Sequence, residues 1–433
     1  MPLEQKQRNE TRRHFLATGT SALGSFLILK PKTVRGYEAN SAVRIGLLGC
    51  GGRGTAVATS FAKNTPARVV ALADIFSDQL DKAKANFDAL SSSLGYPGPD
   101  PKLMFHGPDA YQQLAACTEI DSIQISTPPF FHVEHLHAAI KGGKHAYCEK
   151  PLGIDIPQTN RALEIREQVD GKVSVDVGFQ IRSAPPFREL VDRIHNGAIG
   201  KIVSISAHYY APAITYPSRP DNIMRDELRL RNWNWELALS GDIIVEQDIH
   251  VIDICNWVLN SHPISVAATG SRSVLDHWGD NYDNYQALFT YPDDIHVTLT
   301  AKQYGDDKYF DVSEQVFGSK GFSESPYSGN LRIAGDNPWQ WQQAQTEQAG
   351  NSGFSATGQF SDNLAQADSE KDKGFIDSIV SGKFHNQIAT GVETARSAIM
   401  ARMSARERRP ITWDECLRSK QHFDPALDLK HFS

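Results

Sequence analysis

The chain has 433 residues, a length that favours two to three domains. Of these residues 40% are hydrophobic and 22% charged, a composition typical of a soluble globular protein. Lys and Arg total 44 against 51 Asp and Glu, and the formal net charge of -7 argues against nucleic acid or an anionic membrane as the main partner. Five Cys are too few for a disulfide framework, and no run of about 18 apolar residues predicts a membrane-spanning helix.

The first 40 residues differ from this average. Arg12-Arg13 precedes a weakly apolar stretch at 15–29 and then a polar tail, which is the layout of an export signal of the twin-arginine type. We therefore expect residues 1–40 to be a signal peptide and linker, and the protein to be exported folded to the periplasm or another extracytoplasmic space. No Cys follows the apolar stretch closely, so we expect no lipid anchor. The alternative is a disordered basic arm with a chance Arg-Arg pair.

A glycine-rich turn follows the next apolar run. A strand expected at 43–48 leads into Gly-Cys-Gly-Gly-Arg-Gly and then into a helical pattern, the context in which Gly-x-Gly-x-x-Gly is typical of dinucleotide binding. Gly49 permits the tight turn, Gly51 lets the backbone approach a pyrophosphate, and Gly54 lets helix and strand pack closely. The residues of this turn expected at the cofactor are Gly49, Gly51, Gly52, Arg53 and Gly54.

The next expected strand, 68–73, ends in Asp74, twenty residues after Gly54. A carboxylate at this position accepts hydrogen bonds from the adenosine ribose and repels a 2′-phosphate, so NAD is favoured over NADP. Arg53 could offset part of that repulsion, which keeps NADP open. The alternative is an α/β domain that binds something else or nothing.

Strand and helix patterns alternate as far as Lys150, which predicts a parallel sheet with its ligand at the carboxyl ends of the strands. Thr127 and Lys150 follow strands there, together with Gly49 and Asp74. Beyond this region, consecutive strands with short turns at 264–317 predict an antiparallel sheet. We therefore expect an α/β chain with a Rossmann domain over 41–160 and an α+β domain with a large, mostly antiparallel open sheet over 161–420.

A helix expected from about 242 to 257 carries Glu246, His250 and Asp253 on one face, because they are spaced by four and three residues. With an ordinary pKa of about 6.5, His250 suits a general base, and Asp253 suits orienting it or binding substrate. The alternative for His250 is a hydrogen-bonded core histidine. Trp233 suits either a sugar ring or ordinary packing. The spacing of His132 and His137 places them on different helix faces, so we expect no metal site.

The glycine-rich turn, Thr127-Pro128 and Glu149-Lys150-Pro151 resemble the Gfo/Idh/MocA family (glucose–fructose oxidoreductase and inositol dehydrogenase) over about residues 43–420. The resemblance implies that Lys150 donates to the substrate oxygen, that the Lys-Pro bond is commonly cis, and that Glu149 lies against the nicotinamide ribose. Further residues it implies near the cofactor are Thr127, Pro128, His132 and Gln180, with Arg182 toward the substrate.

The resemblance also implies features beyond these contacts. The family has an Asp where this chain has Glu246, four residues before the catalytic His. Its open sheet packs against another subunit, so we expect a homodimer or homotetramer. A late helix at about 390–405 is expected to pack back onto the nucleotide domain.

These expectations combine into an exported NAD(P)-dependent oxidoreductase acting on a sugar, glycoside or polyol. His250 would take the hydroxyl proton while Lys150 steadies the developing alkoxide. Because a periplasm offers little soluble NAD, we expect the cofactor to be tightly bound. Two alternatives stay open: an NAD-dependent glycosidase acting by oxidation, elimination and re-reduction, and a non-catalytic sugar-binding protein on the same fold.

Overall fold

The computed structural model describes residues 42–169, 171–214, 223–275, 279–305, 310–342 and 361–432. The expected signal peptide, with its Arg-Arg pair, lies outside the described residues. Within the described part of the chain, no helix is both long and apolar enough to cross a membrane.

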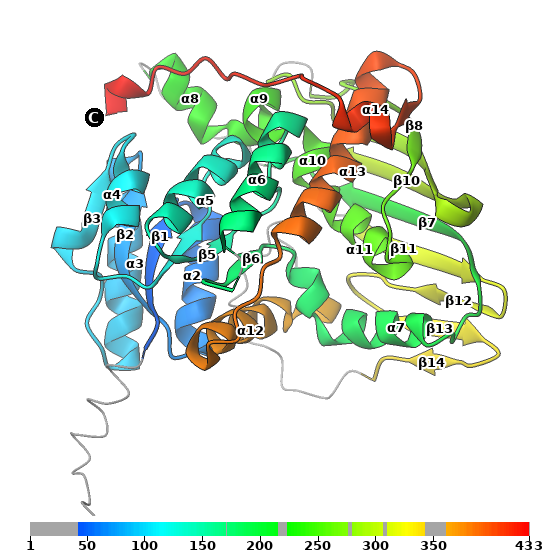
Figure 1. Ribbon diagram of the computed structural model, residues 1–433, viewed down its shortest axis with the longest axis horizontal. Coiled ribbons are helices and arrows are strands. Elements are labelled where there is room, and N and C mark those ends of the chain that lie inside the picture. Colours follow the sequence, from blue (N-terminus) through cyan, green and yellow to red (C-terminus); the bar gives the residue numbers. More distant parts are fainter. Residues whose placement is uncertain are drawn as a thin grey trace, which may run out of the picture. The chain divides into compact units, whose positions relative to one another are not determined.

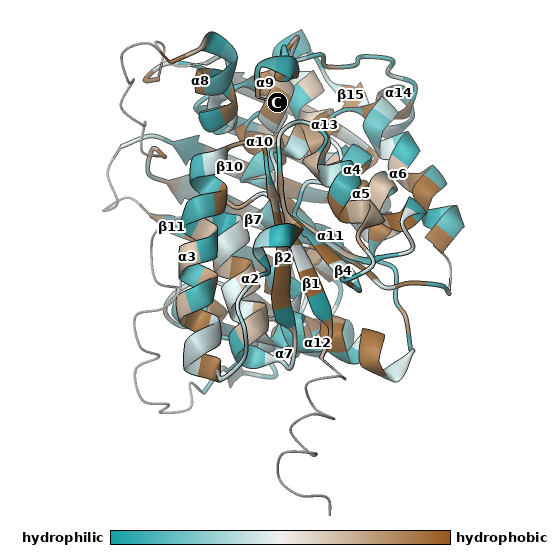
Figure 2. Ribbon diagram, turned by 90° about the vertical axis from the view of Figure 1, so that its left-hand side faces the viewer, coloured by the Kyte–Doolittle hydropathy of each residue, from teal (hydrophilic) through white to brown (hydrophobic). Residues whose placement is uncertain are grey.

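The first sheet is parallel throughout, with the strand order β3-β2-β1-β4-β5-β6. Helices cover both of its faces: α2, α3 and α12 lie on one, and α4, α5 and α6 on the other (Figure 2). Its strands are β1 (Arg44–Leu48), β2 (Arg68–Asp74), β3 (Met104–His106), β4 (Ser122–Ile125), β5 (His145–Cys148) and β6 (Val175–Val177). Its helices are α2 (Gly52–Asn64), α3 (Ser77–Leu94), α4 (Ala110–Ala116), α5 (His132–Lys141), α6 (Ile156–Val169) and α12 (Ala367–Ser381).

This sheet extends beyond residue 160, where we expected the first domain to end. Helix α6 acts as a crossover that returns the chain to the sheet, and β6 then pairs with β5 in parallel, with Val175 opposite Ala146. Strand β6 therefore belongs to the first sheet and not to the second sheet.

The second sheet has the order β14-β13-β12-β11-β7-β10-β9-β8-β15 and is antiparallel except between β7 and β10. Alternate residues of β7, such as Ile205 and Ala207, are buried under helices, as expected for a sheet covered on one face. Its strands are β7 (Ile202–Ala211), β8 (Ser265–Ser271), β9 (Asn284–Tyr291), β10 (Ile295–Gln303), β11 (Asp311–Gly318), β12 (Gly321–Glu324), β13 (Arg332–Gly335), β14 (Trp339–Gln340) and β15 (Ile411–Thr412). The associated helices are α7 (Pro185–His195), α8 (Arg225–Arg231), α9 (Leu237–Ser240), α10 (Ile243–Glu246), α11 (Ile249–Leu259), α13 (Ile388–Glu407) and α14 (Trp413–Leu417).

Helix α13 lies between the two sheets (Figure 1), in contact with α6 on one side and β8 on the other. Its range, Ile388–Glu407, includes the late helix that we expected at about 390–405. Gly391 allows close approach to β6, because a Cβ there would lie 3.0 Å from the Val177 side chain.

The single helix expected at 242–257 is wrong. The N–H groups of Gln247 and Asp248 both donate to the carbonyl of Ile243, at 2.7 and 3.0 Å, which ends α10 in a widened turn. Helix α11 then begins at Ile249. Glu246 and His250 therefore lie on different helices, and helical spacing does not relate their directions.

Candidate functional site

Two adjoining cavities follow the carboxyl ends of the strands of the first sheet. The larger, the Asp74 cavity, has a volume of about 420 Å³, and the smaller, the Lys150 cavity, about 310 Å³. They share a wall formed by Gly51, Gly52, Ser126, Thr127, Arg231 and Trp233. Together they form an elongated cleft that crosses the N-terminus of α2.

The glycine-rich turn has the geometry of a phosphate-binding loop. Gly49 has φ +91°, and a Cβ there would lie 2.6 Å from the carbonyl of Ser126. A Cβ on Gly54 would lie 2.0 Å from the carbonyl of Gly49, whereas a Cβ on Gly51 would meet nothing within 4 Å. The turn therefore leaves no room for a side chain at Gly49 and Gly54, where the backbone is closely packed. At Gly51, which lines the cleft, the space is open. This open cradle at a helix N-terminus fits a pyrophosphate.

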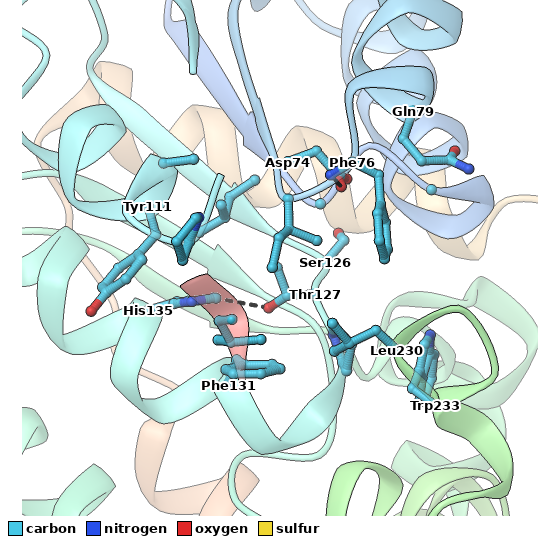
Figure 3. A pocket seen from close by; sticks show the side chains of 18 of the residues that line it. Asp74, Phe76, Gln79, Tyr111, Ser126, Thr127, Phe131, His135, Leu230 and Trp233 are labelled. Atoms are coloured by element: carbon cyan, nitrogen blue, oxygen red, sulfur yellow. Dashed lines mark hydrogen bonds between the residues drawn. The ribbon is translucent and has the colours of Figure 1, made fainter. Parts of the chain in front are cut away.

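Asp74 ends β2 at the wall of the Asp74 cavity. Its carboxylate accepts hydrogen bonds from the backbone N–H of Cys50 at 2.6 Å and of Phe76 at 2.9 Å, and burial raises its pKa. Each oxygen keeps a further lone pair for a ribose hydroxyl. Figure 3 shows Asp74 beside Phe76 and Gln79, with Tyr111 toward the other end of the cavity.

Arg53 does not approach Asp74. Its Nε lies 2.9 Å from Oε1 of Glu149, and its Nη2 lies 3.2 Å from Oδ1 of Asp368 on α12. It lines the Lys150 cavity and not the Asp74 cavity. The expectation that Arg53 could offset repulsion between Asp74 and a 2′-phosphate is therefore not met, because two carboxylates hold its guanidinium elsewhere.

Lys150, which follows β5 of the first sheet, forms an ion pair with Glu246 at the end of α10. Lys150 Nζ lies 2.7 Å from Oε1 of Glu246 and also donates to the backbone carbonyl of that residue. The Lys150–Pro151 peptide bond is cis. The pair lies at the wall of the smaller cavity.

His250 lines the same cavity. Burial, and next the positive charge of Lys150, hold the pKa of His250 well below its ordinary value, so the imidazole is neutral near pH 7. Its Nδ1 is buried and has no hydrogen-bond partner among the described residues. The interpretation of His250 as a hydrogen-bonded core histidine therefore does not fit, and the neutral ring is able to accept a proton.

Two family models match this chain. Residues 43–177 match the oxidoreductase family with an NAD-binding Rossmann fold, and residues 187–324 match the GFO/IDH/MocA C-terminal domain. These matches together span more than half of the chain. The chain belongs to the Gfo/Idh/MocA family. Within that family it is an oxidoreductase that binds NAD.

Relatives of this Gfo/Idh/MocA oxidoreductase include two inositol dehydrogenases. The inositol 2-dehydrogenase of Rhizobium meliloti (strain 1021) is 27% identical over 64% of this chain and 74% of its own length. The myo-inositol 2-dehydrogenase of Thermotoga maritima is 25% identical over 87% of this chain and its own full length. Among solved structures, scyllo-inositol dehydrogenase from Lactobacillus casei with bound NAD(H) and scyllo-inositol has a TM-score of 0.65 at 20% identity, covering 86% of this chain and 99% of its own.

In this Gfo/Idh/MocA chain, Asp253 does not orient His250 as we expected. Its Oδ2 accepts from Arg182 Nε at 2.7 Å, and its Oδ1 accepts from Arg182 Nη2 and from Thr394 Oγ1, both at 2.9 Å. Neither Arg182 nor Asp253 lines the two cavities. The pair instead ties α11 to the 3-10 turn Gln180–Ser183 and to α13.

The other expected residues lie where the sequence placed them, at the cleft. Gln180, Trp233 and Glu149 line the Lys150 cavity, Pro128 lines the Asp74 cavity, and Thr127 lines both. Glu149 is buried and accepts from the hydroxyl of Tyr147 at 3.2 Å.

His132 is also at the cleft but has a positioning role in this Gfo/Idh/MocA fold. Its ring nitrogens contact the carbonyls of Thr127 at 2.7 Å and Pro151 at 2.8 Å, so the ring bridges the turn after β4 and the one after β5. Both turns carry residues of the site, and His132 fixes their separation.

Sequence reasoning missed Arg231 and the apolar wall of the Asp74 cavity. Arg231 Nη2 lies 2.7 Å from Oδ1 of Asp78, and its guanidinium lies 4.0 Å from the centre of the Phe76 ring. Leu230 and Leu429 line that cavity. These residues come from segments distant in the chain, and no local pattern marked them.

Proposed function

We propose that this protein transfers hydride between the carbinol carbon of a sugar, glycoside or polyol and nicotinamide. The observation that carries the proposal is that neutral His250 and the Lys150–Glu246 pair open onto one cavity, which adjoins the glycine-rich cradle. The printed names of the relatives, inositol dehydrogenases among them, support a polyhydroxylated substrate.

The chain's own residues supply the proton chemistry. In the oxidation direction, the imidazole of His250 accepts the proton of the substrate hydroxyl. Lys150, fixed by Glu246, donates a hydrogen bond to the same oxygen and stabilises negative charge that develops on it. A bound nicotinamide would supply the carbon that accepts the hydride, and a carbonyl product remains.

The polar side chains of the Lys150 cavity support a hydroxyl-rich substrate. The amide oxygens of Gln180, Asn234 and Gln247 are buried there and have no hydrogen-bond partner among the described residues. Buried acceptors are normally satisfied, and the hydroxyls of a sugar or polyol ring would satisfy them. Trp233 offers an apolar ring face in the same cavity.

The test is a panel of polyols, sugars and glycosides incubated with the purified protein and NAD+. The expected result is NADH formation with one class of substrate, and loss of that activity in His250→Ala. Free sugar released from a glycoside without net NADH would instead identify the glycosidase cycle. Binding of a sugar with neither outcome would identify a non-catalytic binding protein.

We also propose that the second sheet mediates a homodimer or homotetramer. Its uncovered face presents Leu288, 44% exposed, and Phe317, 39% exposed, among small and polar side chains. Exposed apolar side chains on a broad sheet favour an interface. Leu288→Lys and Phe317→Lys together should lower the mass measured by light scattering, and a monomeric unaltered chain would contradict the proposal.

Finally, we propose export by the twin-arginine route, on the basis of Arg12-Arg13 and the weakly apolar stretch after it. Fusion of residues 1–40 to a folded reporter should deliver it to the periplasm of a bacterium that has this route. Arg12→Lys with Arg13→Lys should abolish delivery, whereas delivery that survives both changes would rule out this route.

A further inference from the structure

The C-terminal tail, residues 418–432, reaches from the second sheet to the nucleotide-binding domain. It leaves α14 and crosses the molecule to end beside α8 (Figure 1). Its last turn is the 3-10 helix Leu429–Phe432, and Leu429 lines the Asp74 cavity. A segment about 350 residues distant in sequence thus completes the wall of the site around Asp74.

The end of the tail is packed, not merely adjacent. Phe432 is 8% exposed, and its ring meets that of Phe76 edge-on with the centres 5.6 Å apart. Phe432 also belongs to an apolar cluster with Leu230 of α8, against which Leu429 packs. The cluster therefore joins the loop after β2, helix α8 and the tail over one end of the cleft.

Hydrogen bonds anchor the tail along its path. The N–H of Phe423 donates to Asp155 at 3.0 Å. The carbonyl of Pro425 accepts from Arg229 at 2.8 Å, and the N–H of Asp428 donates to Asp226 at 2.9 Å, so α8 and the tail are joined at two points.

Helix α8 is itself tied to the nucleotide-binding domain. Arg231, its last residue, pairs with Asp78 on α3 and covers the face of Phe76. The tail and α8 thus close over the same loop together.

We propose that the tail and α8 form a clasp that holds the adenosine half of the cofactor in the Asp74 cavity between turnovers. The apolar wall of Phe76, Leu230 and Leu429 suits the flat face of adenine, and Asp74 suits the ribose hydroxyls. Because the clasp packs over this end of the cleft, its opening limits nucleotide release. The inference rests on the NAD binding that underlies the proposed function, and it assigns cofactor retention to Leu429 and Phe432.

Cofactor release tests the clasp directly. Protein loaded with NADH is mixed with excess NAD+ in a stopped-flow instrument, and the loss of bound NADH fluorescence gives the dissociation rate. The double variant Leu429→Ala, Phe432→Ala should release NADH at least tenfold faster than the unaltered chain. Lys430→Ala is the matched control, because its exposed side chain lines neither cavity, and it should change the rate less than twofold.

A second variant, ending at Asp424, removes the end of the tail that carries Leu429 and Phe432, and it guards against local misfolding in the double variant. Circular dichroism and thermal melting establish that each protein is folded. Release within twofold of the unaltered rate in either folded variant would overturn the clasp. Because no carbohydrate is present, failure of the carbohydrate reaction leaves this result intact, whereas a folded unaltered chain that binds no NADH would overturn both proposals.

Discussion

At the scale of single residues, the site depends on one pair of charges and one neutral ring. Burial and the charge of Lys150 lower the pKa of His250, so activity should fall only at a pH below the ordinary value of about 6.5. Lys150→Met removes that charge and should raise the pKa of His250, which moves the acid limb of the kcat/KM profile to higher pH. It should also lower kcat by about 10²- to 10⁴-fold, since in the proposed reaction Lys150 donates to the reacting oxygen. A slow variant whose acid limb does not move would show that the two groups are not coupled.

The same residues show which parts of the site could be predicted from the sequence. Lys150 and His250 could be placed at the cleft, because a strand end and a family motif fix the first, and an ionisable residue in an apolar helix marks the second. The partner of Asp253 could not be predicted, because spacing along a helix gives a face and not what that face meets. Arg182 and Thr394 reach it from elements 71 and 141 residues away.

At the scale of elements, the unit formed by β1, the glycine turn and α2 could be predicted from the sequence. Its requirements are local: an apolar strand, glycines where the backbone packs closely, and a helical pattern. The break between α10 and α11 could not be predicted, because the apolar residues on both sides fit one continuous helix. Its cause is a pair of hydrogen bonds converging on the carbonyl of Ile243, which no residue type signals.

The glycine turn makes a prediction that separates binding from folding. Gly51→Ala adds a methyl group to open space, with backbone φ of -68° that alanine adopts freely, so the melting temperature should hardly change. The methyl group protrudes into the cleft, and the Kd for NADH should rise about tenfold, which is about 1.4 kcal/mol.

Gly54→Ala is the contrasting change, because its Cβ would lie 2.0 Å from the carbonyl of Gly49. The turn must shift, so both the melting temperature and NADH affinity should fall. Calorimetric melting and NADH titration on the two variants measure both quantities. Equal loss of stability in both would contradict the assignment of Gly51 to the open side of the turn.

At the scale of the whole molecule, the site spans elements of both sheets, and α13 holds them together. Arg402 is 1% exposed, and its Nη1 donates at 2.8 Å to the carbonyls of both Ile154 and Gly241. Ile154 follows the Lys150 turn, and Gly241 precedes α10, which carries Glu246. The guanidinium thus fixes the separation of the two segments whose side chains form the Lys150–Glu246 pair. The sequence indicated a late helix in contact with the nucleotide domain but not this bridge, because a buried arginine is not distinguishable from an exposed one by pattern.

The contribution of Glu314 to the stability of the folded protein should fall as pH rises. This side chain is fully buried on β11, where Ser325 Oγ donates to it at 2.8 Å, and burial raises its pKa from 4.5 to about 8. The pKa of Glu314 is higher in the folded than in the unfolded protein. Its contribution to the free energy of unfolding is therefore fully present below pH 4.5 and is lost as pH rises through about 8. Glu314→Gln, which stays neutral, should therefore lose less stability than the unaltered chain between pH 5 and pH 8, by about 2–4 kcal/mol. Urea unfolding of the two proteins at both pH values measures this difference in the free energy of unfolding. The other buried carboxylates are the same in both proteins, so their effects cancel. Parallel pH profiles would show that Glu314 is ionised in the folded state near neutral pH.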